Sequence, residues 1–360
     1  MEDTIYPIII DNGTETIKAG FAGEEGPRFV IPSVVSQIND QLEFGNEALN
    51  HKYGRFNLHY PVKYGLIKDW DRVEKLWDYI FSSQLRLDPQ EYKVVLTEAG
   101  LTPKEDREKM AQIMFEKFNV EGLYIGNQGL LSLYFNGYQT GIVCNSGASV
   151  THTIPIKDGL VIQPAVGRVE LGGTDLTKYF AKRLAEKGFA FSSPAELDIV
   201  KQMKESHCTV AQDFEAEFSK TEDIAYQLPD GQAIRVGNER LQCAEALFKP
   251  QELLGRELDS IQDMIIKSID GCDEDLKSSL YGTVVLSGGN TMFGGIRERL
   301  QQELDSKASG VKVIANDNRR FEAFLGASTV CQLSMMEAMW VSQEEYKEHG
   351  LSIVHTKCPQ

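Results

Sequence analysis

Three short turns rich in Gly, Ser and Asn carry groups that can hold phosphate. Asp11-Asn12-Gly13, Asn145-Ser146-Gly147 and Ser287-Gly288-Gly289-Asn290 each follow an apolar run. Turns of this kind point several backbone N–H groups in one direction, a geometry that binds phosphate oxygens. Lys18 lies just beyond the first turn and can place a positive charge on the same phosphates. Asp11 can hold a hydrated Mg²⁺, because that ion prefers carboxylate and water ligands.

Apolar runs of strand length must position these turns. Runs at 5–10 and 17–21 flank the first turn, and runs at 140–144 and 150–156 flank the second. Each pair predicts a hairpin. The two hairpins are alike and lie about 134 residues apart, which indicates two similar domains facing each other across a cleft. A third strand, at 283–286, leads into the third turn.

Helical patterns alternate with these strands. They are predicted at 70–84, 103–118, 174–187, 193–206, 250–270 and 293–306. Two of these helices have clear start signals, namely Thr102 as the N-cap before Pro103, and Ser193 before Pro194 with Glu196 two residues further on. The alternation predicts α/β sheets with helices on their faces.

Composition excludes several classes of protein. The chain has 360 residues, of which 42% are hydrophobic and 25% charged, as in a globular protein of about two domains. Its 53 acidic and 37 basic residues give a charge of −16, which disfavours nucleic acid as a direct partner. Residues 122–156 carry no Asp, Glu, Lys or Arg, but polar residues interrupt this stretch too often for a membrane span. The six cysteines form no CxxC pair and residues 1–10 carry no basic segment, so we expect reduced thiols in a cytosolic or nuclear protein without a structural zinc site.

Longer motifs make the chain resemble actin. Asp11-Asn12-Gly13-Thr14 with Lys18-Ala19-Gly20-Phe21 is similar to the first phosphate loop of actin. Similar segments follow in order: Tyr60-Pro61, Asp69-Trp70, Leu96-Thr97-Glu98-Ala99, Leu130-Leu131-Ser132-Leu133-Tyr134, Val150-Thr151-His152-Thr153, Leu228-Pro229-Asp230-Gly231, Gly237-Asn238-Glu239-Arg240 and Ser352-Ile353-Val354-His355. The resemblance covers essentially the whole chain. It implies the α/β actin-like fold of the actin, Hsp70 and sugar-kinase superfamily, with two related domains around a nucleotide cleft.

The resemblance also implies how the chain is divided. A smaller outer domain would comprise 1–135 and 333–360, with a shortened insertion at about 33–61. A larger inner domain would comprise 136–332, with a further insertion at about 174–260.

The same resemblance implies a site for ATP or ADP with Mg²⁺ or Ca²⁺. Asp11 would hold the metal through water. The residues implied to contact the phosphates are Gly13, Thr14, Lys18, Ser146 and Gly147. Those implied to lie near the base and ribose are Gly173, Lys201, Lys204, Glu205, Gly289, Asn290, Met292, Phe293 and Arg320. Gln128 and His152 match the residues that position the attacking water in actin, and phosphoryl transfer to water needs positioning more than covalent chemistry.

Both phosphate loops depart from the pattern of actin. The second loop of the family reads Asp-Ser-Gly-Asp-Gly, whereas this chain has Asn145-Ser146-Gly147-Ala148-Ser149. Asn145 lacks the charge that orders the water around the metal, and losing such a group typically costs about 10²–10⁴ in rate. Ala148 cannot hydrogen-bond the ribose. Glu15 replaces a Gly in the first loop and would repel phosphate unless it points outward or onto the metal. We therefore expect at most a slow ATPase.

Two further departures concern assembly. The chain between Val35 and Gly45 is shorter than in actin, where this loop inserts into the next subunit of the filament. The apolar plug of actin is replaced by residues 251–257, whose charged side chains are costly to desolvate without partners. These changes predict limited self-polymerisation.

The leading interpretation is a divergent actin-like cytoskeletal protein that holds its nucleotide as a structural cofactor. It would act in the cytoplasm or cytoskeleton, or in a nuclear complex. Its partners would be actin-like subunits or actin-binding and scaffold proteins, in a hetero-assembly rather than a long homopolymer. The alternative is a filament-forming actin ATPase of a divergent lineage. A small-molecule kinase on the same fold is disfavoured, because no large insertion remains to bind a sugar.

Some side chains leave two interpretations open. Cys358 is either an exposed reactive thiol or an inert one. Met335, Met336 and Met339 either line an apolar groove for a partner or pack in the core.

Overall fold

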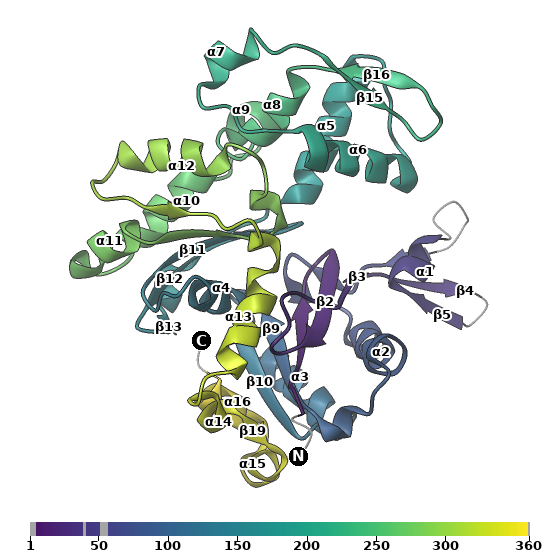
Figure 1. Ribbon diagram of the computed structural model, residues 1–360, viewed down its shortest axis with the longest axis vertical. Helices are drawn as coiled ribbons and strands as arrows, with labels where there is room; N and C mark the ends of the chain where they lie inside the picture. Colours follow the sequence, from purple (N-terminus) through teal and green to yellow (C-terminus); the bar gives the residue numbers. More distant parts are fainter. Residues whose placement is uncertain (1–4, 39–40, 51–56, 359–360) are drawn as a thin grey trace. The chain divides into compact units, whose positions relative to one another are not determined.

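A computed structural model describes residues 5–38, 41–50 and 57–358 (Figure 1). By its contacts the chain divides into two units. Unit 1 comprises Met1–Val143, Ile154–Val166 and Phe321–Gln360, and unit 2 comprises Cys144–Thr153 and Gly167–Arg320. The expected domain bounds stay a prediction. The insertion expected at about 33–61 lies partly outside the described residues.

A six-stranded mixed sheet forms the centre of unit 1, with the order β19-β10-β9-β1-β2-β3. Its strands are β1 (Ile8–Asn12), β2 (Thr16–Phe21), β3 (Phe29–Pro32), β9 (Lys93–Glu98), β10 (Gly122–Asn127) and β19 (Val341–Ser342). β1, β9 and β10 run parallel, whereas β2, β3 and β19 pair antiparallel with their neighbours. β1 is apolar and buried throughout its Ile8-Ile9-Ile10 run, as expected for a central strand covered on both faces. The first predicted hairpin is confirmed.

The helices of unit 1 supply the rest of its core. They are α2 (Trp70–Tyr79) with a π-helical continuation (Ile80–Leu85), α3 (Lys104–Glu116), α4 (Gln128–Phe135), α13 (Glu322–Cys331), α14 (Met336–Met339), α15 (Gln343–His349) and α16 (Ile353–Lys357). α13 lies alongside α4 (Figure 1). Gly326 permits this approach, because a Cβ there would lie 1.9 Å from the carbonyl oxygen of Leu131. Cys358 and Met336 are buried in this core, Met339 packs against it, and Met335 is exposed.

A small three-stranded sheet with the order β5-β4-β6 also belongs to unit 1. It contains β4 (Val35–Ile38), β5 (Gln41–Phe44) and β6 (Asn57–His59), followed by the short pair β7 (Val62–Lys63) and β8 (Leu66–Ile67). α1 (Gly45–Asn50) follows β5. The shortened segment at 36–44 therefore consists of two paired strands, and residues 39–40 lie outside the described part.

The second mixed sheet has the order β13-β12-β11-β17-β18, with β14 paired to β12. Its strands are β11 (Gly141–Ser146), β12 (Thr151–Lys157), β13 (Leu160–Val161), β14 (Gly167–Val169), β17 (Val284–Ser287) and β18 (Val313–Ile314). β11 and β12 are neighbours joined by the second predicted turn, so this sheet repeats the arrangement of β1 and β2. The third predicted strand corresponds to β17, and the turn after it begins with a 3₁₀ segment (Gly289–Thr291).

The helices of unit 2 are α5 (Gly173–Glu186), α6 (Pro194–His207), α7 (Phe214–Phe218), α8 (Glu239–Glu245), α9 (Pro250–Leu254), α10 (Ile261–Asp270), α11 (Glu274–Tyr281) and α12 (Ile296–Asp305). A separate hairpin joins β15 (Ile224–Gln227) to β16 (Ala233–Val236). The start signal of α6 is confirmed, since the Ser193 side chain caps the Glu196 N–H and the Glu196 carboxylate accepts from the Ser193 N–H.

Two predictions about helices are wrong. The helix predicted at 250–270 is two helices, because Gly255 adopts a left-handed conformation (φ 65°) that ends α9. Thr102 is not the N-cap of α3. Pro103 occupies that position, and the Thr102 hydroxyl donates instead to the carbonyl of Ala99.

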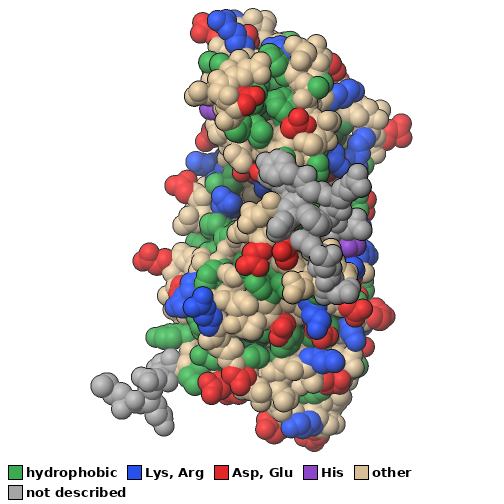
Figure 2. All heavy atoms as spheres, turned by 90° about the vertical axis from the view of Figure 1, so that its right-hand side faces the viewer, with side chains coloured by type: hydrophobic (Ala, Val, Ile, Leu, Met, Phe, Trp, Pro, Cys, Tyr) green, Lys and Arg blue, Asp and Glu red, His purple; other side chains and the backbone are tan. Residues whose placement is uncertain are grey.

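The surface carries charges of both signs. Figure 2 shows acidic and basic side chains interspersed over the face that it draws. Across residues 5–38, 41–50 and 57–358, every helix is too short or too polar to cross a bilayer.

Candidate nucleotide-binding residues

In unit 1 the candidate residues gather where three parallel strands end. The carboxyl ends of β1, β9 and β10 lie at the same edge of the sheet and place Asp11, Thr97 and Gln128 together. The Thr97 hydroxyl donates to Asp11 Oδ1 at 2.6 Å. Gln128 Nε2 donates to the same oxygen at 2.9 Å and lies 3.2 Å from Thr97 Oγ1. We call these three residues the carboxyl-edge cluster.

The position of Gln128 is set by the start of α4. Asn127, the last residue of β10, is the N-cap, and its side chain accepts from the N–H groups of Gly129 and Leu130. Gln128 is therefore the first helical residue and its side chain returns over the end of β1, where Nε2 also donates to the carbonyl of Asn12 at 3.1 Å.

The first predicted phosphate turn is tight and needs glycine. A Cβ on Gly13 would lie 2.4 Å from the carbonyl oxygen of Thr16 and 3.3 Å from Lys18 Nζ. The hydroxyl of Thr14 accepts from the N–H of Gly65 at 3.0 Å. Glu15 is exposed at the tip of the turn. The turn thus brings Gly13 close to the Lys18 ammonium, as a phosphate-holding loop requires.

Asp11 fits a metal held through water better than one bound directly. The residue is buried, and its Oδ1 already accepts from Thr97 and Gln128. Oδ2 lies 3.1 Å from Lys18 Nζ. Because a carboxylate oxygen has about two lone-pair directions, a water of a hydrated Mg²⁺ can still approach Oδ2. Within the described ranges, His, Cys, Asp and Glu side chains form no group of three that would coordinate a metal on their own.

In unit 2 the second predicted turn packs against the start of α5. The N–H of Gly147 donates to the carbonyl of Val150, which closes the turn. The N–H groups of Gly173 and Thr174 then donate to the carbonyls of Gly147 and Ala148 at 3.0 and 2.7 Å. The loop carbonyls therefore occupy two of the first N–H groups of α5, so these groups are not the ones that meet a phosphate.

Four of the predicted residues of unit 2 meet around Gly173. Asn290 Nδ2 donates to Ser146 Oγ at 3.0 Å, and Lys204 Nζ donates to the carbonyl of Gly173 at 2.7 Å. A Cβ on Gly173 would lie 3.2 Å from Lys204 Nζ and 3.4 Å from Asn290 Oδ1. Ser146, Lys204 and Asn290 are all buried.

The acceptor Oδ1 of Asn290 is buried and has no hydrogen-bond partner within the described residues. Leaving such an atom unsatisfied typically costs about 1–3 kcal/mol. A hydroxyl or amino group of a bound ribose or base would satisfy it. Within unit 2, this acceptor is the feature that best matches the nucleotide implied by the sequence.

Most of the other predicted residues of unit 2 are more exposed. Gly289, Met292 and Arg320 are exposed, while Phe293 is buried. Lys201 and Glu205 lie one turn apart on α6, with Lys201 Nζ 3.9 Å from Glu205 Oε1.

His152, predicted to position water, lies on β12 opposite Arg168 and is buried. Burial disfavours the imidazolium and, together with the charge of Arg168, lowers the pKa of His152 to about 4. The side chain is therefore neutral at pH 7. Gln128 belongs to unit 1 and His152 to unit 2, so their joint role in positioning water stays a prediction.

The neutral state of His152 predicts a pH dependence of stability. An unfolded chain, with a pKa near the ordinary 6.5, takes up this proton before the folded chain does. Stability is therefore lost as the pH falls from about 6.5 to about 4, by up to about 1.4 kcal/mol per pH unit. We expect the unfolding midpoint to fall less between pH 7 and pH 5 in His152→Gln than in the unmodified chain. His349→Gln, at an exposed position, should leave it unchanged, and equal slopes for all three proteins would contradict the assignment.

The backbone conformation of Gly288 predicts that a substitution there destabilises the fold. Its φ of 89° is left-handed, and a Cβ would lie 2.3 Å from the carbonyl oxygen of Ser146 and 2.7 Å from Asn145 Oδ1. Gly288→Ala should therefore destabilise unit 2 by about 2–3 kcal/mol. The neighbouring Gly289→Ala meets no atom within 4 Å and should change little. Hydrogen exchange of the β17 amides measures the stability of both variants. Equal protection of these amides in Gly288→Ala and Gly289→Ala would contradict the prediction and show that the turn can rearrange.

Sequence reasoning missed residues that hold the site in place. Thr97 links Asp11 to Gln128. It lies at the end of a strand parallel to β1, and this position is the signal that could have identified it as a site residue. Trp77 Nε1 donates to Asn12 Oδ1 at 3.0 Å. Arg319, the neighbour of the predicted Arg320, holds the third turn, since its guanidinium donates to the carbonyl of Thr291 at 2.9 and 3.0 Å.

These features define a class of α/β protein in which two mixed sheets each present a tight, glycine-dependent turn lined with polar side chains. A protein-family model, described as Actin, matches residues 2–359. The chain belongs to the actin family and has the actin fold. Membership implies, in general terms, a nucleotide-binding and cytoskeletal role. The family typically binds ATP or ADP with a divalent cation.

Proposed function

We propose that this chain binds ATP or ADP with Mg²⁺ or Ca²⁺ as a structural cofactor and hydrolyses it slowly or not at all. We further propose that it acts as a subunit of a defined actin-like or cytoskeletal assembly with limited self-polymerisation. Its expected location is the cytoplasm and cytoskeleton, or a nuclear complex. Its expected partners are actin-like subunits and actin-binding or scaffold proteins.

The unsatisfied Asn290 Oδ1 carries the proposal of nucleotide binding. It lies beside Gly173 and Lys204, which the resemblance assigns to the base and ribose. The proximity of Gly13 to Lys18 Nζ supports a phosphate position in unit 1. A bound nucleotide stabilises the folded chain by mass action, which is the sense in which it is structural.

The proposal predicts that Asn290→Ala weakens ATP binding. Loss of one hydrogen bond to the ligand should reduce the affinity by up to about 10-fold. Isothermal titration of nucleotide-free protein with Mg-ATP measures the change. Asn46→Ala, an exposed substitution on α1, is the control. An unchanged affinity in Asn290→Ala would remove the main support for the site.

Weak hydrolysis is supported by the second loop. The family pattern has two carboxylates in this loop, whereas Asn145 and Ala148 provide none. Only the first of these carboxylates orders the water around a metal, so that water has one acidic neighbour fewer. Asp11 still provides a carboxylate in unit 1, already engaged by Thr97, Gln128 and Lys18. This combination of residues favours binding of the nucleotide without rapid hydrolysis.

The assembly proposal rests on the short β4–β5 segment and on residues 251–257. In the structure this second segment carries the end of α9 and the turn at Gly255. Arg256 donates to Asp175 and to the carbonyl of Glu170, so its charge is used within unit 2. Sedimentation of the purified protein with Mg-ATP tests the proposal. Short or no polymers are expected, and long homopolymers would contradict it.

The alternative remains a filament-forming ATPase of a divergent lineage. It is favoured by two retained features, namely the Gln128 amide over Asp11 and the neutral imidazole of His152. Phosphate release that accelerates with assembly would establish this alternative.

A further inference from the structure

The hydroxyl of Thr97 is the centre of the carboxyl-edge cluster. The side chain is completely buried. Its Oγ1 donates to Asp11 Oδ1 at 2.6 Å and accepts from Gln128 Nε2 and from the N–H of Asn12, both at 3.2 Å. A threonine hydroxyl offers one donor and two acceptor positions, so all three are used.

These contacts leave one arrangement of protons. The Gln128 amide nitrogen and the Asn12 N–H are both donors, so the proton of the Thr97 hydroxyl must point to Asp11. The separation of 2.6 Å is typical of a charge-assisted hydrogen bond from a hydroxyl to a carboxylate. Asp11 Oδ1 therefore accepts twice, from Thr97 and from Gln128 at 2.9 Å.

The same contacts fix the orientation of the Gln128 amide. Three acceptors surround its Nε2, namely Asp11 Oδ1, the carbonyl of Asn12 at 3.1 Å and Thr97 Oγ1. A flipped amide would place its oxygen against these oxygens, so the hydrogen-bond network assigns the nitrogen to this side. The nitrogen faces the strand ends, and Oε1 is left for a ligand or a water.

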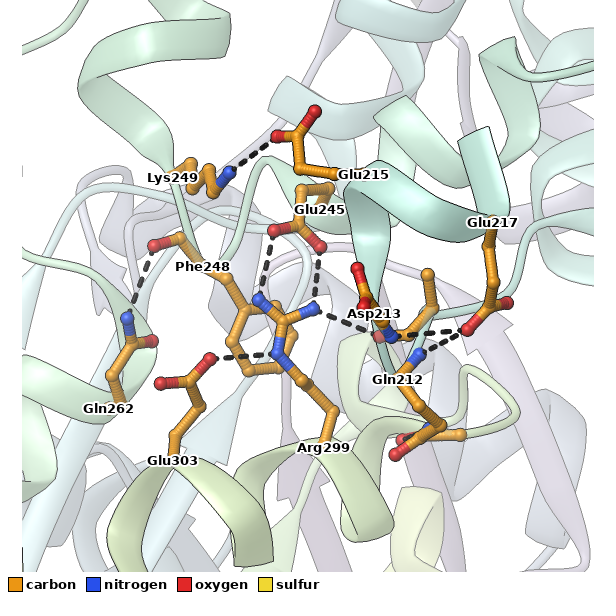
Figure 3. Close-up of polar contacts among 12 residues, drawn as sticks. Gln212, Asp213, Glu215, Glu217, Glu245, Phe248, Lys249, Gln262, Arg299 and Glu303 are labelled. Atoms are coloured by element: carbon orange, nitrogen blue, oxygen red, sulfur yellow. Dashed lines mark hydrogen bonds and ion pairs between the residues drawn. The ribbon is translucent and has the colours of Figure 1, made fainter. Parts of the chain in front are cut away.

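A buried polar cluster in unit 2 has a different character (Figure 3). The Arg299 guanidinium contacts both oxygens of Glu245 at 2.9 and 3.0 Å and donates to the carbonyl of Ala211. The two charges cancel within this cluster, and its members are not among the residues predicted to hold the nucleotide. Arg299 therefore joins α12 to α8, whereas the Thr97 hydroxyl acts on a residue with a predicted ligand.

Asp11 would lose its alignment without the Thr97 hydroxyl. Its Oδ2 already lies 3.1 Å from Lys18 Nζ. A carboxylate that loses one donor turns toward the charged donor that remains, so Asp11 would draw closer to Lys18. Oδ2 would then be less available to a water of a hydrated metal, and Lys18 would be less available to phosphate. Groups that orient a metal-holding side chain typically contribute about 10–100-fold to metal affinity.

We propose that Thr97 is a positioning residue of the nucleotide site. Its hydroxyl holds the Asp11 carboxylate in the alignment that lets Oδ2 meet a metal-bound water, and it keeps the nitrogen of the Gln128 amide turned toward Asp11. The gain in ATP affinity that Mg²⁺ provides therefore depends on Thr97. This inference rests on the proposed nucleotide site.

Isothermal titration of the nucleotide-free full chain with ATP, at saturating Mg²⁺ and in EDTA, tests the proposal. The ratio of the two affinities measures what the metal contributes. Thr97→Val removes the hydroxyl and should lower this ratio about 10-fold, the lower end for groups that orient a metal-holding side chain. Thr97→Ser keeps the hydroxyl and should keep the ratio of the unmodified chain.

Thr102 provides a matched control, because it is also buried in unit 1 and its hydroxyl donates to the carbonyl of Ala99. Thr102→Val removes an internal hydroxyl that is not part of the carboxyl-edge cluster, and it should leave the ratio unchanged. If Thr97→Val folds poorly, Thr97→Cys replaces the hydroxyl by a weak donor and should lower the ratio in the same direction.

An unchanged ratio in the Thr97 variant would overturn the proposal. So would an equal loss of ATP affinity with and without the metal, because that result is the one expected of a purely structural residue. Absence of ATP binding by the unmodified chain, under both conditions, would instead overturn the proposed function and this inference with it.

Discussion

Replacing Arg107 by methionine should destabilise unit 1 by about 3–5 kcal/mol, the usual cost of removing one partner of a buried ion pair. Arg107 Nε lies 3.0 Å from Glu98 Oε2, and both side chains are almost completely buried. Nη2 donates to the carbonyl of Cys358 at 2.5 Å. Arg107→Met therefore removes the counter-charge of Glu98 and the attachment of the end of α16 in a single step.

Hydrogen exchange of the β9 amides measures this effect, because it reports on unit 1 by itself. Protection factors should fall by at least about 100-fold, as 3 kcal/mol implies. Lys109→Met is the matched control, since Lys109 lies on the same helix, is exposed and donates a hydrogen bond to the nearby Gln112. Glu98→Leu combined with Arg107→Met should recover much of the protection. A small effect of Arg107→Met would mean that water reaches Glu98.

Asn145→Asp should raise the rate of ATP hydrolysis by about 10²-fold, the lower end of the range for a positioned proton-accepting or metal-ordering group. Asn145 is the half-buried residue next to the end of β11 and lies beside Gly288, where a Cβ would lie 2.7 Å from Asn145 Oδ1. Asp has the same shape, so it fits this space and restores the charge that the family pattern has there. Phosphate release under saturating Mg-ATP measures the rate.

The control for this substitution is Asn46→Asp, which adds the same charge at an exposed position on α1. It should leave hydrolysis unchanged. Equal rates for Asn145→Asp and the unmodified chain would mean that Asn145 is not what limits turnover, and that Glu15 or Ala148 should be reverted next.

The strands that carry the site were predictable because they are buried and uniformly apolar. Ile8-Ile9-Ile10 and the run before Asn145 each specify a central strand, and the turn residues mark where it ends. The prediction stopped the first strand too early, because Asp11 and Asn12 are polar but still pair within β1. Their partners, Thr97 and Gln128, come from other strand ends, which local patterns do not connect.

Side-chain capping and helix ends were only partly predictable. Ser193 and Glu196 form the capping box that their spacing indicates. Thr102 has the same local signal, but its hydroxyl finds the carbonyl of Ala99 instead, a choice that depends on how the chain leaves β9. Apolar periodicity continues across Gly255, so it does not reveal that the helix ends there.

The burial of single residues could not be predicted from their place in the sequence. Cys358 lies near the end of the chain, where an exposed thiol was one of two interpretations, yet it is fully buried against β10 with its Sγ 3.4 Å from the N–H of Ile125. Burial raises its pKa to about 12. The inert interpretation is therefore the right one, and long-range packing rather than local sequence decides it.

Nucleotide content and turnover, measured on one purified sample, test the central proposal most directly. The protein is denatured, the released nucleotide is identified by chromatography, and phosphate release is followed with Mg-ATP present. Our account predicts about one ATP or ADP per chain, by the mass action of a tight site, with negligible turnover. A chain without nucleotide, or rapid turnover that rises with protein concentration, would contradict it.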